Sequence, residues 1–431
     1  MADNAERTRE DATPESAQVA ESVRAAHAAA PAIAAAPEHV IEATLRGMAR
    51  LLTQAHDVVL KANAEDSRAA AAAGMSGGLL DRLRLDRPRL AAMAAQITAL
   101  AEIPPEPVRR PVRELDHGLV LEEWRRPVGV IGANFEARPN VTVDVSSQLV
   151  KSRNAGVLRT GSAALASAAA LLDHVVAPAL AGAGLPSDAI QLVRARGRDA
   201  AQALVTHPRL MPLVILRGSG ESTRSLAELA AGHGVRTLAH ADGGAVLYLD
   251  AAADVAKAHA LVAASLDRLG VCNRLNLLLV HRDRYDELVP SLVELLAARE
   301  PSIAASLAPH PHPMGHEWAL DPAAETTVTI AVADGPADAA RIANEETSGL
   351  AAGIVTEDGD AAREFLARYT GTGAFWNATT RLLDGFKLLG VPETGINIDR
   401  VPGPRGPVTF RDLSLRQYVV VPADRATDLP R

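Results

Sequence analysis

The first part of the chain has a helical spacing of apolar positions. From Ala17 to about Leu100 it is rich in Ala, Leu and Arg, and the stretch GMSGG at residues 74–78 is the main break. Apolar residues at this spacing predict amphipathic helices, and paired glycines predict an interruption. We therefore expect a helical lead-in. Residues 1–16 are charged and lack an apolar segment, which predicts a disordered tail.

After Leu119 the pattern changes to short apolar runs that alternate with helical stretches. A first set of runs ends near residue 244, and a second set occupies residues 245–376. Apolar strands separated by helices are typical of a parallel sheet with helices on both faces, which binds ligands at the carboxyl ends of its strands. The pattern predicts an α/β protein with two parallel-sheet domains, over residues 17–244 and 245–376.

The last part of the chain, residues 377–431, is predicted to be a return segment that ends in a strand. The stretch RGPVTFRDLSLRQYVVVP has the alternating character of an edge strand, and LVLEEW within residues 119–125 is a second exposed strand. Exposed edge strands are templates for pairing with another chain. We expect these two strands to form a small flap, and we expect the protein to be a homo-oligomer.

Composition narrows the range of partners and compartments. The 431 residues carry a formal net charge of -8, and the pI is near 5.9. Because there is no overall basic field, neither nucleic acid nor an anionic membrane is an expected partner. The single cysteine excludes an intrachain disulfide framework and a thiolate metal cluster, which fits a reducing compartment. We expect a cytoplasmic protein.

Two conspicuous stretches have plain structural explanations. HPHPMGH at 310–316 is punctuated by prolines and has no carboxylate at metal-ligand spacing, so an exposed loop is favoured over a metal site. The apolar window GSAALASAAALLDHVVAPALAGAGLP is interrupted by Asp173, His174 and Pro178, which favours a packed helix over a membrane span. The N-terminus lacks the pattern of a signal peptide.

Candidate anion sites follow two of the predicted strands. No G-x-G-x-x-G motif follows a strand, so the usual dinucleotide fingerprint is absent. VLRTGS at 157–162 and ILRGSGES at 215–222 each open a helix, where backbone N–H groups bind anions, and each supplies an Arg. Gly and Ser also cap helices in ordinary turns, so both phosphate binding and plain turn chemistry stay open.

The only cysteine, Cys272, lies in the stretch GVCN just before a predicted strand. An accessible thiol of lowered pKa is a nucleophile, and backbone N–H groups in such a loop stabilise an oxyanion. Free cysteines are also common as small buried core residues. Spacing alone leaves both interpretations open.

Four stretches together resemble one family. RRPVGVIGANFEARPNVTVD followed by LVKSRNAGVLRTGS is similar to PLGVIG-x-x-YEARPNVTVD and LKSGNA-x-LRGGS of the γ-glutamyl phosphate reductase family, within the aldehyde dehydrogenase superfamily. GVCNRLNLLLVH resembles its VCNA-x-ETLLVH, WNATTRLLDG its VNASTRFTDGG, and RGPVTFRDLSLRQYVV its ARGPMGLEELTTYKYVV. The resemblance runs from about residue 20 to 421, and EARPNVTVD is its most specific string.

The resemblance implies an aldehyde-dehydrogenase-like fold, with a helical and nucleotide-binding domain, a catalytic domain and a small oligomerisation flap. It also implies NADPH-dependent reduction of L-glutamate 5-phosphate to glutamate 5-semialdehyde and phosphate in proline biosynthesis, coupled to an amino-acid kinase. Cys272 would attack the acyl phosphate and form a thioester, which hydride then reduces. A thiolate suits both halves of this reaction because it is a strong nucleophile and a good leaving group.

By position, the resemblance implies two sets of binding residues. The residues expected to hold NADP(H) are Arg159, Gly161, Ser162, Arg217, Gly218 and Ser219. The residues expected to hold the substrate are Arg138, Asn140, Asn377, Thr380, Arg381 and Asp384. A permanent planar cation such as Arg159 fits a phosphate well. The alternative for each Arg is a surface ion pair.

A missing carboxylate favours a reductase over a hydrolytic enzyme. Hydrolytic members of the superfamily carry a Glu general base in an ELGG segment, and the corresponding stretch AHADGG at 239–244 has no Glu. His240 and Asp242 are candidate substitutes for that base. Strand-end capping is the alternative role for both residues.

Several positions that are polar in the family are apolar in this chain. A Cys-His pair is replaced by Ala245 and Val246, and a His-Thr-Asp trio by residues 350–352, Leu-Ala-Ala. We expect a pocket with fewer polar partners to bind a polar amino acid less well, because an unpaired buried charge is costly. Reduction of another acyl phosphate or thioester, aldehyde oxidation, and a non-catalytic nucleotide-binding role therefore stay open as alternatives.

Overall fold

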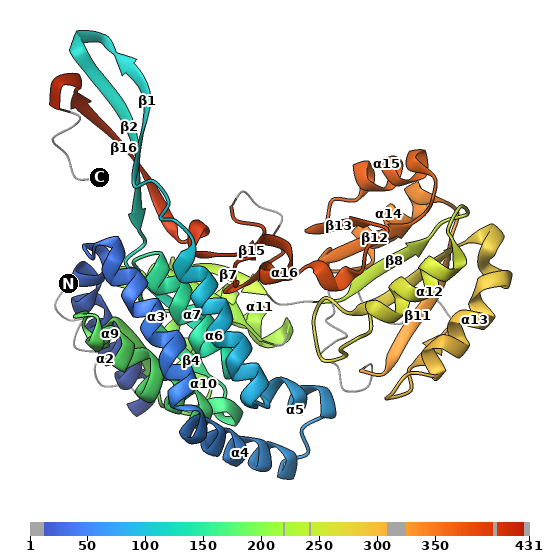
Figure 1. Ribbon diagram of the computed structural model, residues 1–431, viewed down its shortest axis with the longest axis horizontal. Coiled ribbons are helices and arrows are strands. Elements are labelled where there is room, and N and C mark those ends of the chain that lie inside the picture. The colour runs from blue at the N-terminus through green and yellow to red at the C-terminus, as the bar shows by residue number, and fades with distance from the viewer. Residues whose placement is uncertain (1–12, 219, 241–242, 308–324, 400–402, 426–431) are drawn as a thin grey trace.

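The computed structural model describes residues 13–218, 220–240, 243–307, 325–399 and 403–425 (Figure 1). It begins with the helices α2 (Pro14–Ala34), α3 (Glu38–Gln54), α4 (His56–Ala72), α5 (Gly77–Leu83) and α6 (Arg87–Glu102). Thr13 caps α2 by accepting a hydrogen bond from the Ser16 amide at 3.2 Å, and Pro14 occupies the first turn. Because this cap starts the helix, the predicted disordered tail over residues 1–16 is wrong for residues 14–16.

The first α/β unit is built on a five-stranded parallel sheet in the order β5-β4-β3-β6-β7. Its strands are β3 (Val130–Phe135), β4 (Ala155–Thr160), β5 (Ile190–Val193), β6 (Leu213–Arg217) and β7 (Arg236–His240). The connecting helices are α7 (Asn140–Lys151), α8 (Leu165–Leu171), α9 (Ala177–Gly182), α10 (Arg198–Leu204) and α11 (Gly220–Gly232). Every residue of β3 and β4 is buried, as expected for strands covered on both faces.

The second α/β unit is built on a six-stranded sheet in the order β10-β11-β9-β8-β12-β13, all parallel. Its strands are β8 (Ala245–Leu249), β9 (Leu275–His281), β10 (Ala304–Ser306), β11 (Thr327–Ala333), β12 (Ala351–Val355) and β13 (Gly373–Trp376). Its helices are α12 (Val255–Ala264), α13 (Tyr285–Ala297), α14 (Pro336–Glu345) and α15 (Gly359–Arg368). The predicted fold class, with two parallel-sheet α/β units, is confirmed.

A three-stranded antiparallel sheet in the order β1-β2-β16 projects from the first unit (Figure 1). It consists of β1 (Arg109–Leu115), β2 (Leu119–Pro127) and β16 (Ser414–Pro422), so the two stretches expected to form a flap do pair. Sequence patterns did not indicate β1, which is almost wholly exposed and carries no apolar alternation.

After β13 the chain returns toward the first unit. It forms the short helix α16 (Gly385–Leu389) and the hairpin of β14 (Gly395–Asn397) and β15 (Gly406–Val408). Val391, Val408 and Phe410 join the buried core of the first unit. The return segment therefore connects both units beside the candidate site.

The helical stretch Ser162–Gly182 is the one part of the described chain that is long and apolar enough to cross a membrane by composition. Most of it, 61%, is buried inside the protein. It packs against α3 and α4, which is the environment of a core helix.

Candidate active site

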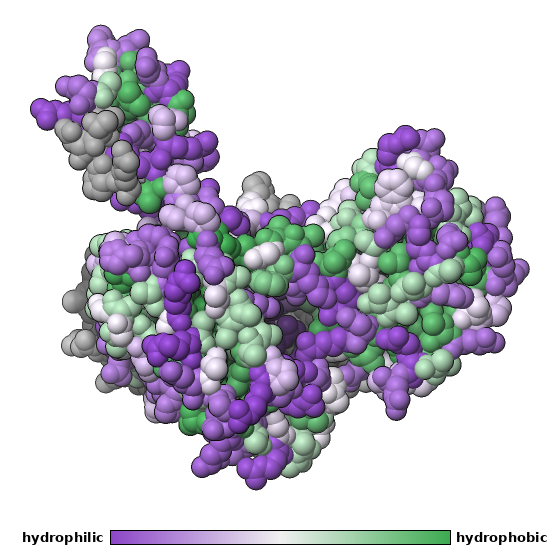
Figure 2. All heavy atoms as spheres, viewed as in Figure 1, coloured by the Kyte–Doolittle hydropathy of each residue, from purple (hydrophilic) through white to green (hydrophobic). Residues whose placement is uncertain are grey.

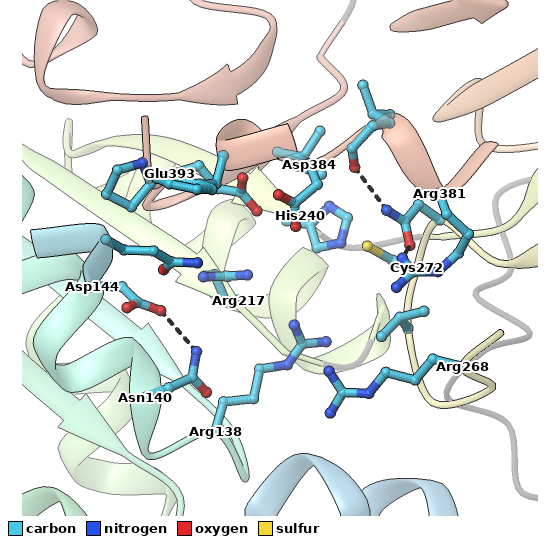
Figure 3. A pocket seen from close by; sticks show the side chains of 17 residues that line it. Arg138, Asn140, Asp144, Arg217, His240, Arg268, Cys272, Arg381, Asp384 and Glu393 are labelled. Atoms are coloured by element: carbon cyan, nitrogen blue, oxygen red, sulfur yellow. Dashed lines mark hydrogen bonds between the residues drawn. The ribbon is translucent and has the colours of Figure 1, made fainter. Parts of the chain in front are cut away.

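A cavity of about 280 Å³ contains Cys272 and draws on both α/β units. The first unit contributes the start of α7 and the ends of β6 and β7, the second contributes the cysteine loop, and the return segment closes one side (Figure 3). In the space-filling view, hydrophilic residues lie in the recess between the two units (Figure 2). The cavity therefore lies at the carboxyl ends of parallel strands, where such sheets bind ligands.

Cys272 lies in the loop between α12 and β9, and 9% of it is exposed. The loop is held on both sides of the thiol. The Cys272 carbonyl accepts a hydrogen bond from the Gly244 amide at 2.7 Å, and Asn273 Nδ2 donates to the Leu383 carbonyl at 2.8 Å. Thr380 Oγ1 donates to the Asn273 carbonyl at 2.9 Å. These bonds fix the backbone that carries the thiol.

One side of Cys272 packs against an apolar cluster. We define the apolar cluster as Ala245, Leu350, Ala351, Phe375, Leu383 and Ile396. Ala245 and Ala351 are register partners on β8 and β12, as are Val246 and Ala352. The two sets of positions that depart from the family pattern are therefore neighbours on adjacent strands. None of residues 245, 246 and 350–352 lines the cavity.

The opposite side is charged. We define the charged lining as Arg138, Arg217, Arg268, Arg381, Asp144, Asp384 and Glu393 (Figure 3). Arg381 Nε donates to Asp267 at 2.6 Å, and the Arg268 guanidinium pairs with Asp81 at 2.7 Å. These pairs orient the two guanidinium groups at the edge of the cavity. Four cations beside one thiol suit an anionic substrate.

Two carboxyl groups in the charged lining have raised pKa values. Burial, opposed by the hydrogen bond from Asn140 and the charge of Arg217, raises the pKa of Asp144 to about 6. Burial, together with the negative charge of Asp384, raises the pKa of Glu393 to about 7. Asn140 Nδ2 donates to Asp144 Oδ2 at 2.7 Å, which fixes the orientation of that amide. Perturbed carboxyl groups in a cleft are typical of functional sites.

The turns expected to hold NADP(H) lie outside this cavity, apart from Arg217. Arg159 is 8% exposed and donates to Asn134 Oδ1 at 3.1 Å and to the Gly197 carbonyl at 2.7 Å. Its Nε is buried without a hydrogen-bond partner, and burial lowers its pKa. Gly161 and Gly218 flank Glu136, and a Cβ on Gly218 would lie 2.9 Å from that carboxyl carbon.

The Arg159 guanidinium and the two glycine turns, unlike the Glu136 carboxyl group between them, fit the pyrophosphate part of a nicotinamide cofactor. β4 and β6 are the two neighbours of β3, so the turns that follow them meet at one edge of the sheet. The turn after β6 opens α11, whose amino end can receive an anion. Ser162 begins a short 3-10 turn ahead of α8, and Ser219 lies outside the described residues.

Some of the other residues predicted from the sequence line the cavity and some do not. Arg138, Asn140, Arg217, Arg381 and Asp384 all line the cavity with Cys272. The structure does not bring two others to it. Asn377 bonds to the Thr356 backbone at 3.0 and 2.9 Å, and Thr380 supports the cysteine loop as described above.

Of the two candidate substitutes for a general base, His240 lines the cavity and is 4% exposed. Asp242 lies outside the described residues, as does the histidine-rich stretch 310–316. No group of three or more His, Cys, Asp or Glu side chains suited to a metal occurs in the part of the chain that the structure describes.

The lining residues that sequence reasoning did not single out include Gln96, Asp144, Arg268 and Glu393. Asp144 had a usable signal, because it lies four residues after Asn140 on a predicted helix and such residues are neighbours. Gln96 and Arg268 had none.

Comparison with known proteins agrees with this architecture. The aldehyde dehydrogenase family model matches residues 5–305. A γ-glutamyl phosphate reductase from Clavibacter michiganensis subsp. michiganensis is 36% identical over 92% of this chain and 93% of its own length. One from Synechococcus elongatus is 33% identical over 87% of each chain.

Solved structures show the same relationship. The γ-glutamyl phosphate reductase from Thermotoga maritima has a TM-score of 0.81 and 25% identity, covering 94% of this chain and 98% of that one. An acetylating aldehyde dehydrogenase from Geobacillus thermoglucosidasius has a TM-score of 0.72 and 14% identity, covering 94% and 97%, and it supports the fold alone.

The chain therefore belongs to the aldehyde dehydrogenase family, among the γ-glutamyl phosphate reductases within it. The resemblance inferred from the motifs is confirmed. Membership makes the protein an oxidoreductase with a small-molecule substrate and a nicotinamide cofactor.

Proposed function

We propose that the protein reduces L-glutamate 5-phosphate to glutamate 5-semialdehyde and phosphate with NADPH, through a thioester on Cys272. The observation that carries this proposal is the cavity itself, which places the only thiol of the chain beside four arginines and three carboxyl groups. The substrate has a phosphate, a carboxylate and an ammonium group. In the charged lining, arginines can pair with the phosphate and the carboxylate, and carboxyl groups can pair with the ammonium group.

The first half of the proposed reaction is acyl transfer. The Cys272 thiolate attacks the acyl carbon, the carbon–oxygen bond to phosphate breaks, and the departing phosphate takes up one proton to leave as a dianion. Arg138, Arg268 and Arg381 neutralise the charge that develops on the leaving group. Asn140 gives one N–H to Asp144, so its other N–H is available to the acyl oxygen. Apolar packing on the far side of the thiol restricts water.

The second half regenerates the thiol. The cofactor supplies a hydride to the thioester carbon when it is bound. Arg159, Gly161, Ser162, Arg217, Gly218 and Ser219 are the residues we assign to its phosphates and ribose. The buried positive charge and unpartnered Nε of Arg159 favour an additional phosphate, which supports NADPH over NADH. The carbon–sulfur bond then breaks, releasing the aldehyde and the Cys272 thiolate.

The absence of a Glu in residues 239–244 supports reduction over hydrolysis, because the Glu general base that hydrolytic members carry in this segment is missing. Acyl phosphates are labile, so an amino-acid kinase must supply the substrate, and we infer functional coupling to one. We also infer that the flap of β1, β2 and β16 pairs with another copy of the chain. The single cysteine supports a cytoplasmic location.

The test is the reverse reaction. Glutamate 5-semialdehyde should reduce more than one equivalent of NADP per active site only when inorganic phosphate is present, because phosphate must release the acyl group from Cys272 before the next turnover. Phosphate-independent turnover would contradict the proposed substrate and favour an aldehyde dehydrogenase instead.

A further inference from the structure

The short helix α5 contacts the cysteine loop across the boundary between the two α/β units. The Asp81 carboxylate pairs with Arg268 at 2.7 Å from Nη2 and 2.8 Å from Nε. The neighbouring Arg82 is 7% exposed, and its Nε donates to the Gly270 carbonyl. Both contacts fall on the segment immediately before Cys272.

Two glycines allow this close approach. A Cβ on Gly270 would lie 2.7 Å from the Gly78 carbonyl oxygen, so a side chain there would collide with backbone. A Cβ on Gly78 would meet the Glu325 side chain and would lie 3.3 Å from Gly270 Cα. A Cβ on Gly77 would meet nothing within 4 Å. The GMSGG break thus has a role beyond interrupting helices.

The far end of α5 is anchored in the first unit. Asn63 Nδ2 on α4 donates to the Leu83 carbonyl at 2.8 Å and to Ser167 Oγ at 3.1 Å, while Asn63 Oδ1 accepts from the Leu85 amide at 2.7 Å. Leu83 is fully buried beside Ala70 and Ala164. Since α5 is fixed to one unit, its contacts with Arg268 and Gly270 restrain the loop of the other.

We propose that Asp81 and Arg82 are positioning residues that hold the segment 268–270 and thereby fix Cys272 against the cavity. Neither residue lines the cavity, so neither is expected to touch substrate. A thiol must lie close to and aligned with the acyl carbon, and a shift of about 1 Å can cost on the order of 100-fold in rate. The proposal rests on the role of Cys272 as the nucleophile.

The primary test compares Arg82→Met with Arg87→Met. Both substitutions remove a guanidinium and keep an aliphatic chain, but Arg87 is largely exposed and pairs with Asp57 instead of the loop. Three quantities are measured in the full chain: amide hydrogen exchange of residues 268–274, the rate at which iodoacetamide alkylates Cys272, and kcat and KM in the reverse reaction. Because the chain has one cysteine, alkylation reports only on Cys272.

Arg82→Met should speed exchange in residues 268–274 and alkylation by about 10-fold, because a loosened loop opens a thiol that is now 9% exposed. It should lower kcat by about 10-fold with little change in KM. Exchange in β8 and β9 should stay as in the unsubstituted protein, and Arg82→Lys should restore part of the loss. Values equal to those of Arg87→Met would overturn the proposal, as would equal acceleration of exchange in β8 and β9.

A second pair covers the case in which Arg82→Met fails to fold. Gly270→Ala should push the loop from α5, because its Cβ would lie 2.7 Å from the Gly78 carbonyl oxygen, and should accelerate alkylation of Cys272, whereas Gly77→Ala should not. Identical alkylation rates in the two variants would overturn the proposal. Amide hydrogen exchange and alkylation of Cys272 need no substrate. They therefore test the positioning role even if the protein does not reduce L-glutamate 5-phosphate.

Discussion

The apolar cluster and the charged lining meet at Cys272 and differ in what they do. The cluster is built from β8, β12 and β13 with Leu383 and Ile396. Apart from Leu383 and Ile396, which also line the cavity, it lies behind the cavity and supports the thiol from within the protein. The charged lining comes from α7, β6, the cysteine loop and the return segment, and it faces the cavity. A position that is polar in the family and apolar in this chain therefore affects substrate choice only where its side chain reaches the cavity.

This distinction removes the reason for doubting a polar substrate. Ala245 and Ala351 are register partners, and so are Val246 and Ala352, so the polar family residues were replaced on both strands together. The expectation that these changes weaken the binding of an amino acid stays a prediction, and the position of these residues outside the cavity lining argues against it.

The largest expected effect comes from the thiol where the two regions meet. Cys272→Ser replaces the nucleophile with a hydroxyl of much higher pKa, so reverse turnover should fall at least about 1,000-fold. The free energy of unfolding should change little. Turnover is measured as phosphate-dependent NADP reduction, and thermal unfolding provides the control. Residual activity within tenfold of the unsubstituted enzyme would reject Cys272 as the nucleophile.

The second effect concerns the charged lining. Arg138→Met should raise KM for glutamate 5-semialdehyde and phosphate by up to about 100-fold, because hydrogen bonds to charged groups are worth roughly 1.5–3 kcal/mol. Arg363→Met is the matched control, since Arg363 lies on α15 with 76% of its side chain exposed. Steady-state kinetics measure both variants. Equal KM values in the two would show that Arg138 does not bind either ligand.

The third effect concerns the apolar cluster. Leu350→His restores a polar residue at one position of the family trio without its partners, so it should lower the free energy of unfolding by about 2 kcal/mol. Its KM should stay within about twofold of the unsubstituted enzyme, because Leu350 does not line the cavity. Denaturant unfolding and steady-state kinetics separate the two quantities. A large rise in KM with unchanged stability would reverse the assignment of the two regions.

The smallest effect is a pH dependence from the charged lining. The folded-state pKa values of Asp144 and Glu393, about 6 and about 7, exceed the ordinary 3.8 and 4.5. The folded state therefore binds more protons, and stability present below about pH 4 is lost as pH rises to about 7. Each group should contribute about 1 kcal/mol after screening by cavity water. Unfolding from pH 4 to 8 should show this decline, and Asp144→Asn with Glu393→Gln should flatten it.

The fold could be predicted from the sequence largely because apolar runs and helical stretches alternate so regularly. Buried strands such as β3 and β8 have apolar sequences whose role is plain from local pattern. The strand β1 could not be found in this way, because its stability comes from pairing with β2 and its residues face solvent.

The site was only partly predictable, because it joins distant segments. Motifs indicated Cys272, Arg138 and Arg381, and these three do line one cavity. Arg268 and Gln96 reach the same cavity from a loop and a helix whose sequences carry no chemical signature. Asn377 and Thr380 lie in a motif with lining residues, but their side chains are used to bond the backbone. Residue type and spacing cannot specify side-chain direction in such turns.

The most direct test of the central claim is a single-turnover experiment without phosphate. The enzyme is mixed with glutamate 5-semialdehyde and NADP in phosphate-free buffer, and NADPH formation and the intact mass are followed. The account predicts a burst of NADPH limited to one per active site, a glutamyl adduct on the peptide that holds Cys272, and its release when phosphate is added. Continued turnover without phosphate, or the same burst and adduct in Cys272→Ser, would contradict it.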